Sequence, residues 1–151
     1  MKKWLRYWHD RRRGTGRGAD VHCVIICGIE AVHHRLQQRL AGETRLRLEA
    51  LVSDAPWQHG TRIAGVRVCY PGEVPALIER TGARALVYCR ETDPAMFDGA
   101  SMRLLKRSPV ALLVLDPDEE DDPADRLLRC LEHEFGHIDE RAGGRRSRDQ
   151  R

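Results

Sequence analysis

The chain has 151 residues, which suffices for one domain with a substantial hydrophobic core and is too few for two domains of ordinary size. Apolar residues make up 41% and charged residues 32%, a composition typical of a globular protein with a highly charged surface. No apolar run approaches the roughly 20 residues that cross a bilayer, and the N-terminus lacks the apolar stretch of a secretory signal peptide, so we expect a cytoplasmic protein.

The first 20 residues form a basic leader, with seven Lys or Arg against two Asp. On a helical wheel of residues 1–13, Trp4, Leu5, Tyr7 and Trp8 lie opposite most of the basic side chains. Tryptophan opposite basic residues suits a membrane surface with anionic lipids. One interpretation is therefore peripheral contact with the inner membrane surface, and the other is a disordered leader. Nucleic-acid binding is disfavoured, because aromatics are sparse elsewhere and no nucleic-acid-binding motif is present.

Five short apolar runs alternate with helical patterns between residues 21 and 115. The runs predict strands at residues 21–27, 46–52, 63–70, 85–89 and 110–115. Helices are predicted from residue 28 to about 40, at 73–81 and at 93–106, where Asp93-Pro94 has the pattern of a helix start. This alternation indicates βαβ units. The predicted fold class is therefore α/β: a Rossmann-like, doubly wound parallel sheet of about five strands, with helices on both faces and an amphipathic helix after it.

Residues 116–125 hold seven acids and no base, which predicts a solvated acidic linker after the core. The C-terminal amphipathic helix is predicted at 126–140, with Leu127, Leu131 and Phe135 on its apolar stripe. We expect this stripe to pack on the domain or on a partner, and a homodimer through the helix is one alternative. Residues 141–151 form a basic tail with five Arg against one Asp.

The candidate binding site lies where the predicted strands end, because a doubly wound sheet binds its ligand past the carboxyl ends of its strands. The candidate binding residues are Gly28, Ile29, Glu30, Ser53, Asp54 and Cys89. At the spacing of the dinucleotide fingerprint G-x-G-x-x-G, the chain has Gly28, Glu30 and His33, so only the first glycine is present. Glu30 puts a negative charge where a pyrophosphate would bind, while His33, His34 and Arg35 are expected to face solvent. Both a retained dinucleotide site and a scaffold that has lost its cofactor stay open.

Three stretches carry a family resemblance: residues 60–68 (GTRIAGVRV), 72–78 (GEVPALI) and 85–88 (ALVY). Over residues 24–89 the chain resembles the CoA-binding-like Rossmann domain of bacterial nucleoside-diphosphate-sugar dehydratases and epimerases of polysaccharide biosynthesis. The resemblance implies a module related to nucleotides or sugar nucleotides, with Gly28 and Asp54 as the positions that carry over. The chain departs from the family in its degraded glycine motif and in Ser53, where the family has an aspartate. It also lacks the Tyr-x-x-x-Lys pair of the family's catalytic domain.

His133-Glu134-Phe135-Gly136-His137 matches the zinc-protease pattern H-E-x-x-H. A third ligand is missing, and both His residues fall on the solvated face of the predicted helix, so we predict no metal site. The five cysteines contain no C-x-x-C pair and are expected to be reduced. Cys27 and Cys89 end neighbouring strands and are expected as buried, inert thiols near the crevice.

The sequence therefore leaves three hypotheses. The first is a stand-alone module that binds a nucleotide, either NAD(P) or a sugar nucleotide, and is accessory to polysaccharide or sugar-nucleotide metabolism. The second is a small oxidoreductase or lyase that uses the same crevice. The third is an interaction protein that binds no nucleotide and dimerises through its C-terminal helix.

Overall fold

The computed structural model describes residues 21–135. The predicted basic leader at 1–20, the predicted tail at 141–151 and the last residues of the predicted C-terminal helix lie outside the described residues. Gly136 and His137 of the H-E-x-x-H pattern lie outside them as well. Within residues 21–135, no helix is long and apolar enough to span a bilayer.

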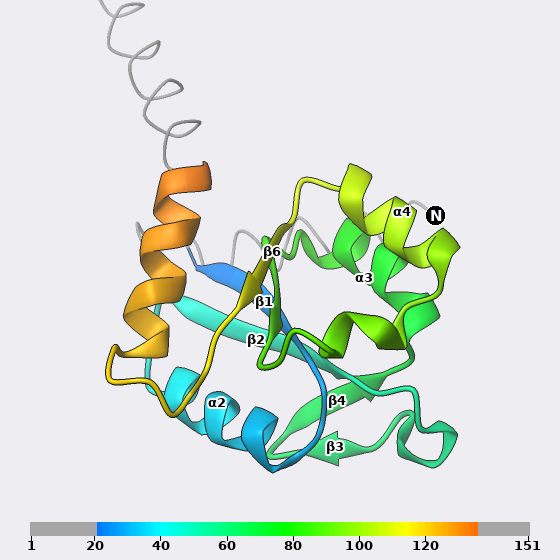
Figure 1. Cartoon of the computed structure of the whole chain (residues 1–151), viewed down its shortest axis with the longest axis horizontal. Helices are drawn as coiled ribbons and strands as arrows, with labels where there is room; N and C mark the ends of the chain where they lie inside the picture. Colours follow the sequence, from blue (N-terminus) through cyan, green and yellow to red (C-terminus); the bar gives the residue numbers. More distant parts are fainter. Residues whose placement is uncertain (1–20, 136–151) are drawn as a thin grey trace, which may run out of the picture.

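A six-stranded sheet forms the centre of the fold (Figure 1). Its strands are β1 (His22–Cys27), β2 (Leu46–Val52), β3 (Arg62–Ile63), β4 (Val66–Cys69), β5 (Ala85–Tyr88) and β6 (Ala111–Val114). Their order across the sheet is β3-β4-β2-β1-β5-β6, and all neighbours are parallel except β3 against β4. The order therefore runs outward from β1 in both directions, and it reverses between β1 and β5.

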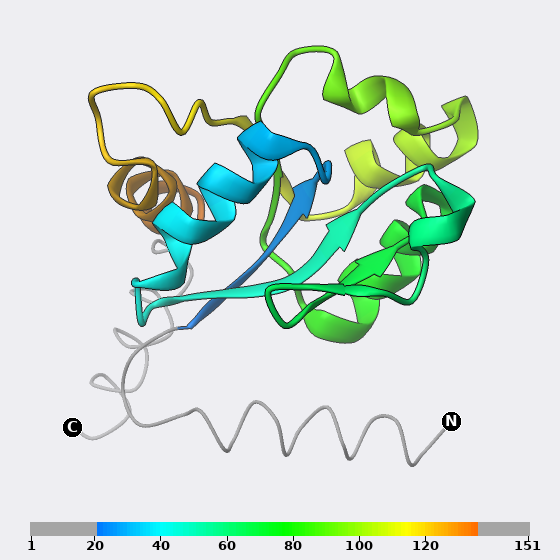
Figure 2. The same ribbon diagram turned by 90° about the horizontal axis from the view of Figure 1, so that it is seen from below.

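Helices cover both faces of the sheet (Figures 1 and 2). One face carries α2 (Ala31–Ala41) and a helix at residues 123–135, and the other carries α3 (Val74–Thr81) and α4 (Gly99–Arg107). Each face has its own cluster of buried apolar side chains. β1 is buried along its whole length between the two clusters, which explains its unbroken apolar sequence. The predicted α/β, Rossmann-like architecture is confirmed.

The apolar stripe of the C-terminal helix packs against the chain's own sheet. Leu127 and Leu131 are fully buried in the same cluster as Leu36 and Leu40 of α2. The helix begins at residue 123, inside the segment predicted as a linker. The acidic loop before it is anchored to α2, because Arg35 donates two hydrogen bonds to Asp118 at 3.0 and 3.1 Å. The stripe is therefore occupied within the chain and is not the surface through which a second copy would bind.

The predicted strand at 63–70 is wrong, because the segment folds into a hairpin. β3 and β4 pair antiparallel around Ala64 and Gly65, whose φ angles are 49° and 82°. Two consecutive residues with positive φ make the tight turn that joins antiparallel strands. The glycine thus reverses the chain instead of lying inside one strand, and the sheet gains a sixth strand.

The predicted helix at 93–106 is also two elements. Asp93–Met96 forms a 3-10 turn (η3), and α4 starts only at Gly99. Between them Phe97 adopts an extended backbone and buries its side chain in the core. Asp98 then caps α4 by accepting a hydrogen bond from the backbone N–H of Ser101 at 2.6 Å. The capping residue of the helix is therefore Asp98, and this leaves Asp93 for another role.

Candidate functional site

The candidate site is the region at the carboxyl ends of β1, β2 and β5, called the crevice below. The order of the strands reverses between β1 and β5, and this reversal is where doubly wound sheets bind their ligands. Three loops meet there: the turn after β1 that leads into α2, the turn after β2, and the loop between β5 and η3. The predicted site residues lie on these three loops, so the fold brings together the positions that the sequence indicated.

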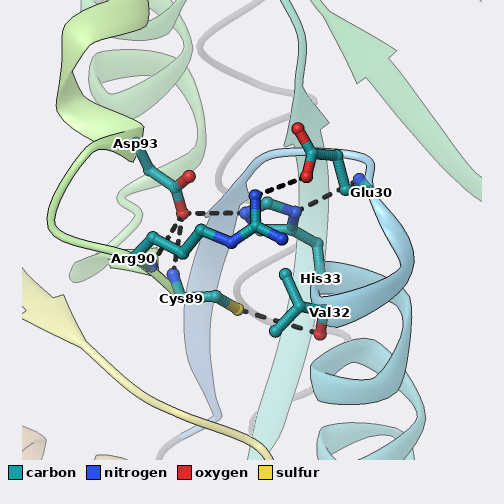
Figure 3. Close-up of polar contacts among 6 residues, drawn as sticks. All are labelled: Glu30, Val32, His33, Cys89, Arg90 and Asp93. Carbon is teal, nitrogen blue, oxygen red and sulfur yellow. Dashed lines mark hydrogen bonds and ion pairs between the residues drawn. The ribbon is translucent and has the colours of Figure 1, made fainter.

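His33 and Asp93 form the buried floor of the crevice (Figure 3). The Nε2 atom of His33 lies 2.8 Å from Oδ2 of Asp93, and the two side chains are only 2% and 9% exposed. The backbone N–H of Glu30 donates to Nδ1 of His33 at 3.2 Å. Because Nδ1 accepts this bond, Nε2 carries the ring proton and donates a hydrogen bond to Asp93. The ring therefore links the first turn of α2 to the loop after β5.

Asp93 also holds the backbone of its own loop. Its Oδ2 atom accepts hydrogen bonds from the backbone N–H groups of Cys89 at 2.9 Å and of Arg90 at 3.0 Å. This one carboxylate oxygen thus accepts three hydrogen bonds, from the ring of His33 and from two backbone N–H groups. The sequence indicated Asp93 only as a helix start. No local pattern distinguishes an aspartate that caps a helix from one that binds a histidine sixty residues away.

His33 occupies the space above Gly28. A Cβ atom built on Gly28 would lie 2.0 Å from Nε2 of His33, and Gly28 itself has a φ of 137°. Both facts require glycine at this position. The expectation that His33 faces solvent is therefore wrong, because its ring turns inward to Asp93. This histidine stands at the third position of the glycine fingerprint, where a glycine would let the helix pack closely on the strand.

Glu30 and Arg90 pair across the mouth of the crevice (Figure 3). The guanidinium of Arg90 donates to Oε2 of Glu30 at 2.5 Å. The two side chains are 64% and 50% exposed, so the pair lies in solvent above the buried His33–Asp93 contact. The sequence placed residues 89–92 at the site but did not single out the side chain of Arg90, since one more arginine in a chain with 26 Lys and Arg carries no signal.

The turn after β2 contributes one free carboxylate. Asp54 is exposed, while Ser53 is only 5% exposed. The hydroxyl of Ser53 accepts a hydrogen bond from the backbone N–H of Ala55 at 3.1 Å, so it stabilises its own turn. Ile29 packs partly buried against the core beside α2. Of these predicted site residues, Asp54 is the one whose side chain is free to reach a ligand.

Cys27 ends β1 and Cys89 directly follows β5, and the two side chains point to opposite faces of the sheet. Cys27 belongs to the core cluster under α3 and α4, and Cys89 belongs to the cluster under α2. Burial raises the pKa of the Cys27 thiol well above its ordinary value and raises the pKa of Cys89 to about 12. A nucleophilic cysteine needs the opposite shift. The prediction that both thiols are buried is confirmed.

The crevice offers little for acid–base catalysis. Both ring nitrogens of His33 are engaged, one with Glu30 and one with Asp93. Burial also raises the pKa of Tyr88, which ends β5, further above its ordinary value of 10.0, so this phenol loses its proton even less readily than a free tyrosine. Within residues 21–135, no group of three or more His, Cys, Asp or Glu side chains could hold a metal ion. Arg90, whose side chain is half exposed, is the cationic group at the mouth of the crevice.

No family model and no curated protein sequence matches the chain. The similarities are structural. UDP-D-quinovosamine 4-dehydrogenase from Vibrio fischeri superposes with a TM-score of 0.51 at 15% identity, covering 63% of this chain and 79% of that chain. RSP, a Rex-family repressor, superposes with a TM-score of 0.51 at 18% identity, and the match covers 85% of this chain and 66% of that chain.

RSP has also been solved with ligands. Its complex with beta-NADH gives a TM-score of 0.50 at 14% identity and covers 97% of this chain and 71% of that chain. Its complex with beta-NAD+ and operator DNA gives a TM-score of 0.51 at 18% identity, and the match covers 93% of this chain and 69% of that chain. At such low identities these likenesses concern the arrangement of strands and helices. Together with the strand order described above, they show that this chain has a Rossmann-like fold.

Proposed function

We propose that the chain is a nucleotide-binding module whose ligand places a phosphate at the mouth of the crevice, beside Arg90 and the first turn of α2. The observation that carries the proposal is the Glu30–Arg90 pair. A carboxylate from the turn after β1 meets a guanidinium from the loop after β5, where doubly wound sheets bind the pyrophosphate of a dinucleotide. In the free protein, the carboxylate of Glu30 takes the place of the ligand's phosphate.

Exchange of Glu30 for a phosphate is favourable on physical grounds. Both partners of the pair are at least half exposed, and an exposed ion pair contributes only about 0–1 kcal/mol. A phosphate carries more charge than a carboxylate and accepts two parallel hydrogen bonds from a guanidinium. The N-terminus of α2 adds an electrostatic preference for an anion. His33 and Asp93 stay in place below, because they are buried and bonded to each other.

The ligand class is NAD(P) or a sugar nucleotide. Two observations support it: the complexes of RSP contain NAD+ and NADH, and the Vibrio fischeri neighbour is named for a UDP-sugar. Asp54 is exposed on the turn after β2 and is the candidate for binding ribose hydroxyls. The family resemblance adds an accessory role in polysaccharide biosynthesis to the proposal, with CoA as a further ligand to test.

Isothermal titration calorimetry of the full chain with NAD+, NADH, NADPH, UDP-glucose and CoA tests the proposal. Thermal denaturation provides a second readout, since a ligand at 100 times its dissociation constant stabilises the protein by about 2.7 kcal/mol. We expect one ligand class to bind, Arg90→Ala to weaken binding about tenfold or more, and Glu30→Gly to tighten it. Arg45→Ala is the matched control, because Arg45 is another exposed arginine paired with a carboxylate, that of Glu43, and it precedes the start of β2, at the opposite end of the strands from the crevice.

Binding of none of these ligands, or equal binding by the wild type and Arg90→Ala, would contradict the proposal. RSP was solved with operator DNA, so the expectation that this chain binds no nucleic acid stays a prediction. An electrophoretic mobility shift with duplex DNA over a series of salt concentrations tests it, since contacts to phosphates weaken steeply as salt rises.

A further inference from the structure

The outer edge of β6 is a second surface of the molecule with the properties of a binding site. β6 is the last strand of the sheet and pairs with β5 on one side only; within residues 21–135 no strand pairs with its other side. Its sequence, ALLV, has no charge and no proline, the two features that usually protect an edge strand from pairing with another chain.

The hydrogen bonds to β5 show which groups of β6 point outward. The backbone N–H groups of Ala111 and Leu115 donate to the carbonyls of Arg84 at 2.8 Å and Tyr88 at 2.7 Å. In a parallel pair, the backbone groups of alternate residues point to opposite sides of the strand. The N–H and C=O groups of Leu112 and Val114 are therefore directed away from β5, toward the open edge.

The side chains of the same two residues are exposed. Leu112 is 38% and Val114 is 46% exposed, and they are two of the five large apolar residues that are exposed in the described part of the chain. Their strand partners Leu86 and Tyr88 belong to the core cluster under α3 and α4, so Leu112 and Val114 lie on that face of the sheet, at its rim. Covering them removes apolar surface from water.

The helix at 123–135 presents a charge gradient along the same edge. A cavity of about 520 Å³ lies between β6 and this helix, and Arg126, Arg129, Cys130, His133 and Glu134 line its helical side. Phe135 lies under the guanidinium of Arg84, which precedes β5, so the helix runs antiparallel to β6. Among the helix side chains that line the cavity, Arg126 and Arg129 are thus beside the end of β6 and Glu134 is beside the start.

We propose that the chain forms a twofold homodimer through antiparallel pairing of β6 with β6 of a second copy. In the register centred on Leu113, Leu112 lies opposite Val114 of the second copy, and each such pair exchanges two hydrogen bonds. Four outward N–H groups find acceptors, and the exposed side chains of both copies meet on one face. The sheet becomes continuous across twelve strands.

The charges of the helix select a second copy as the occupant of this edge. A twofold axis that makes the strands antiparallel also makes the two helices antiparallel. The basic half of each helix, with Arg129, then faces Glu134 of the other copy, so the surface complements itself. A four-residue strand buries too little area for a stable dimer on its own, and the helices supply the remainder.

Sedimentation velocity of the full chain over a concentration series tests the proposal. We expect the wild type to be a dimer. Val114→Pro removes an outward N–H group without touching the bonds to β5, and Leu112→Lys adds a charge at the edge. We expect each change to weaken dimerisation about tenfold or more. Leu104→Lys is the matched control, because Leu104 is an exposed leucine on α4 (52%) and lies off the edge strand.

Charge exchange on the helix tests the orientation of the two copies. Arg129→Glu and Glu134→Arg each place like charges together in the dimer, and we expect each to weaken it about tenfold. The double variant restores opposite charges and is expected to dimerise as the wild type does. A wild type that stays monomeric at roughly 1 mM, or a dimer that survives Val114→Pro and Leu112→Lys, overturns the proposal. A double variant no tighter than the single ones overturns the antiparallel orientation.

Discussion

Replacing Asp93 with alanine is the sharpest test of how the crevice is held together. The carboxylate oxygen Oδ2 accepts three hydrogen bonds, from Nε2 of His33 at 2.8 Å and from the backbone N–H groups of Cys89 at 2.9 Å and Arg90 at 3.0 Å. Asp93→Ala removes the acceptor of all three donors and leaves each of them to find water or remain unbonded.

The magnitude follows from the burial of the donors. Arg90 lies at the exposed mouth of the crevice, so water can replace Asp93 at its N–H group. His33 is 2% and Cys89 is 7% exposed, so their donors stay without a partner. A buried donor that loses its acceptor costs about 1–3 kcal/mol, and the two together about 2–6 kcal/mol. That loss is a large part of the roughly 5–15 kcal/mol by which a domain is stable.

Urea unfolding followed by circular dichroism measures this loss. Asp98→Ala is the matched control, since Asp98 also accepts a backbone hydrogen bond, at the exposed start of α4, and capping bonds contribute about 1 kcal/mol. In a double-mutant cycle with His33→Ala, we expect a coupling of about 1–3 kcal/mol between His33 and Asp93. An Asp93→Ala variant no less stable than Asp98→Ala, or a coupling near zero, would refute the assignment of Asp93 as the anchor of the crevice.

Three further outcomes are expected. Gly28→Ala is strongly destabilised in urea unfolding, because its Cβ would lie 2.0 Å from Nε2 of His33. Adding His33→Ala rescues it only in part, since the φ of 137° still disfavours alanine. The free energy of unfolding falls as pH rises from about 9 to 12. The pKa of Cys89 is raised from an ordinary value of 9.0 to about 12 in the folded protein, so the unfolded chain loses this proton first. Urea unfolding of Cys89→Ala across this pH range should show a smaller fall. Gly65→Ala costs about 1–2 kcal/mol in the same assay, because the turn between β3 and β4 holds Gly65 at a φ of 82°.

Much of the fold could be predicted from local patterns. The apolar runs of β1 and β5 are typical of strands that are covered on both faces, and the alternation of strands and helices restricts the topology to a doubly wound sheet. The leucine stripe at residues 127–131 indicated the buried face of the last helix. Each of these signals is carried by residues that are close in the sequence.

The errors arose where one local pattern fits two structures. Ile63 to Tyr70 has the composition of a strand, and only the positive φ angles at Ala64 and Gly65 make it a hairpin. Asp93-Pro94 resembles a helix start, but Phe97 buries its side chain and interrupts the helix. In both cases, packing against the sheet decided between alternatives that the sequence pattern left nearly equal.

The sequence by itself determined the fold class, the layers and the three loops that form the crevice, because periodicity and turn residues act over a few positions. The contents of the crevice were decided by the tertiary structure. The pairs His33–Asp93 and Glu30–Arg90 each join residues sixty positions apart, on segments after β1 and β5 that are adjacent because these two strands are neighbours in the sheet. Whether His33 turned outward to water or inward over Gly28 depended on a buried acceptor for its ring proton, and the fold supplies that acceptor from the distant end of β5.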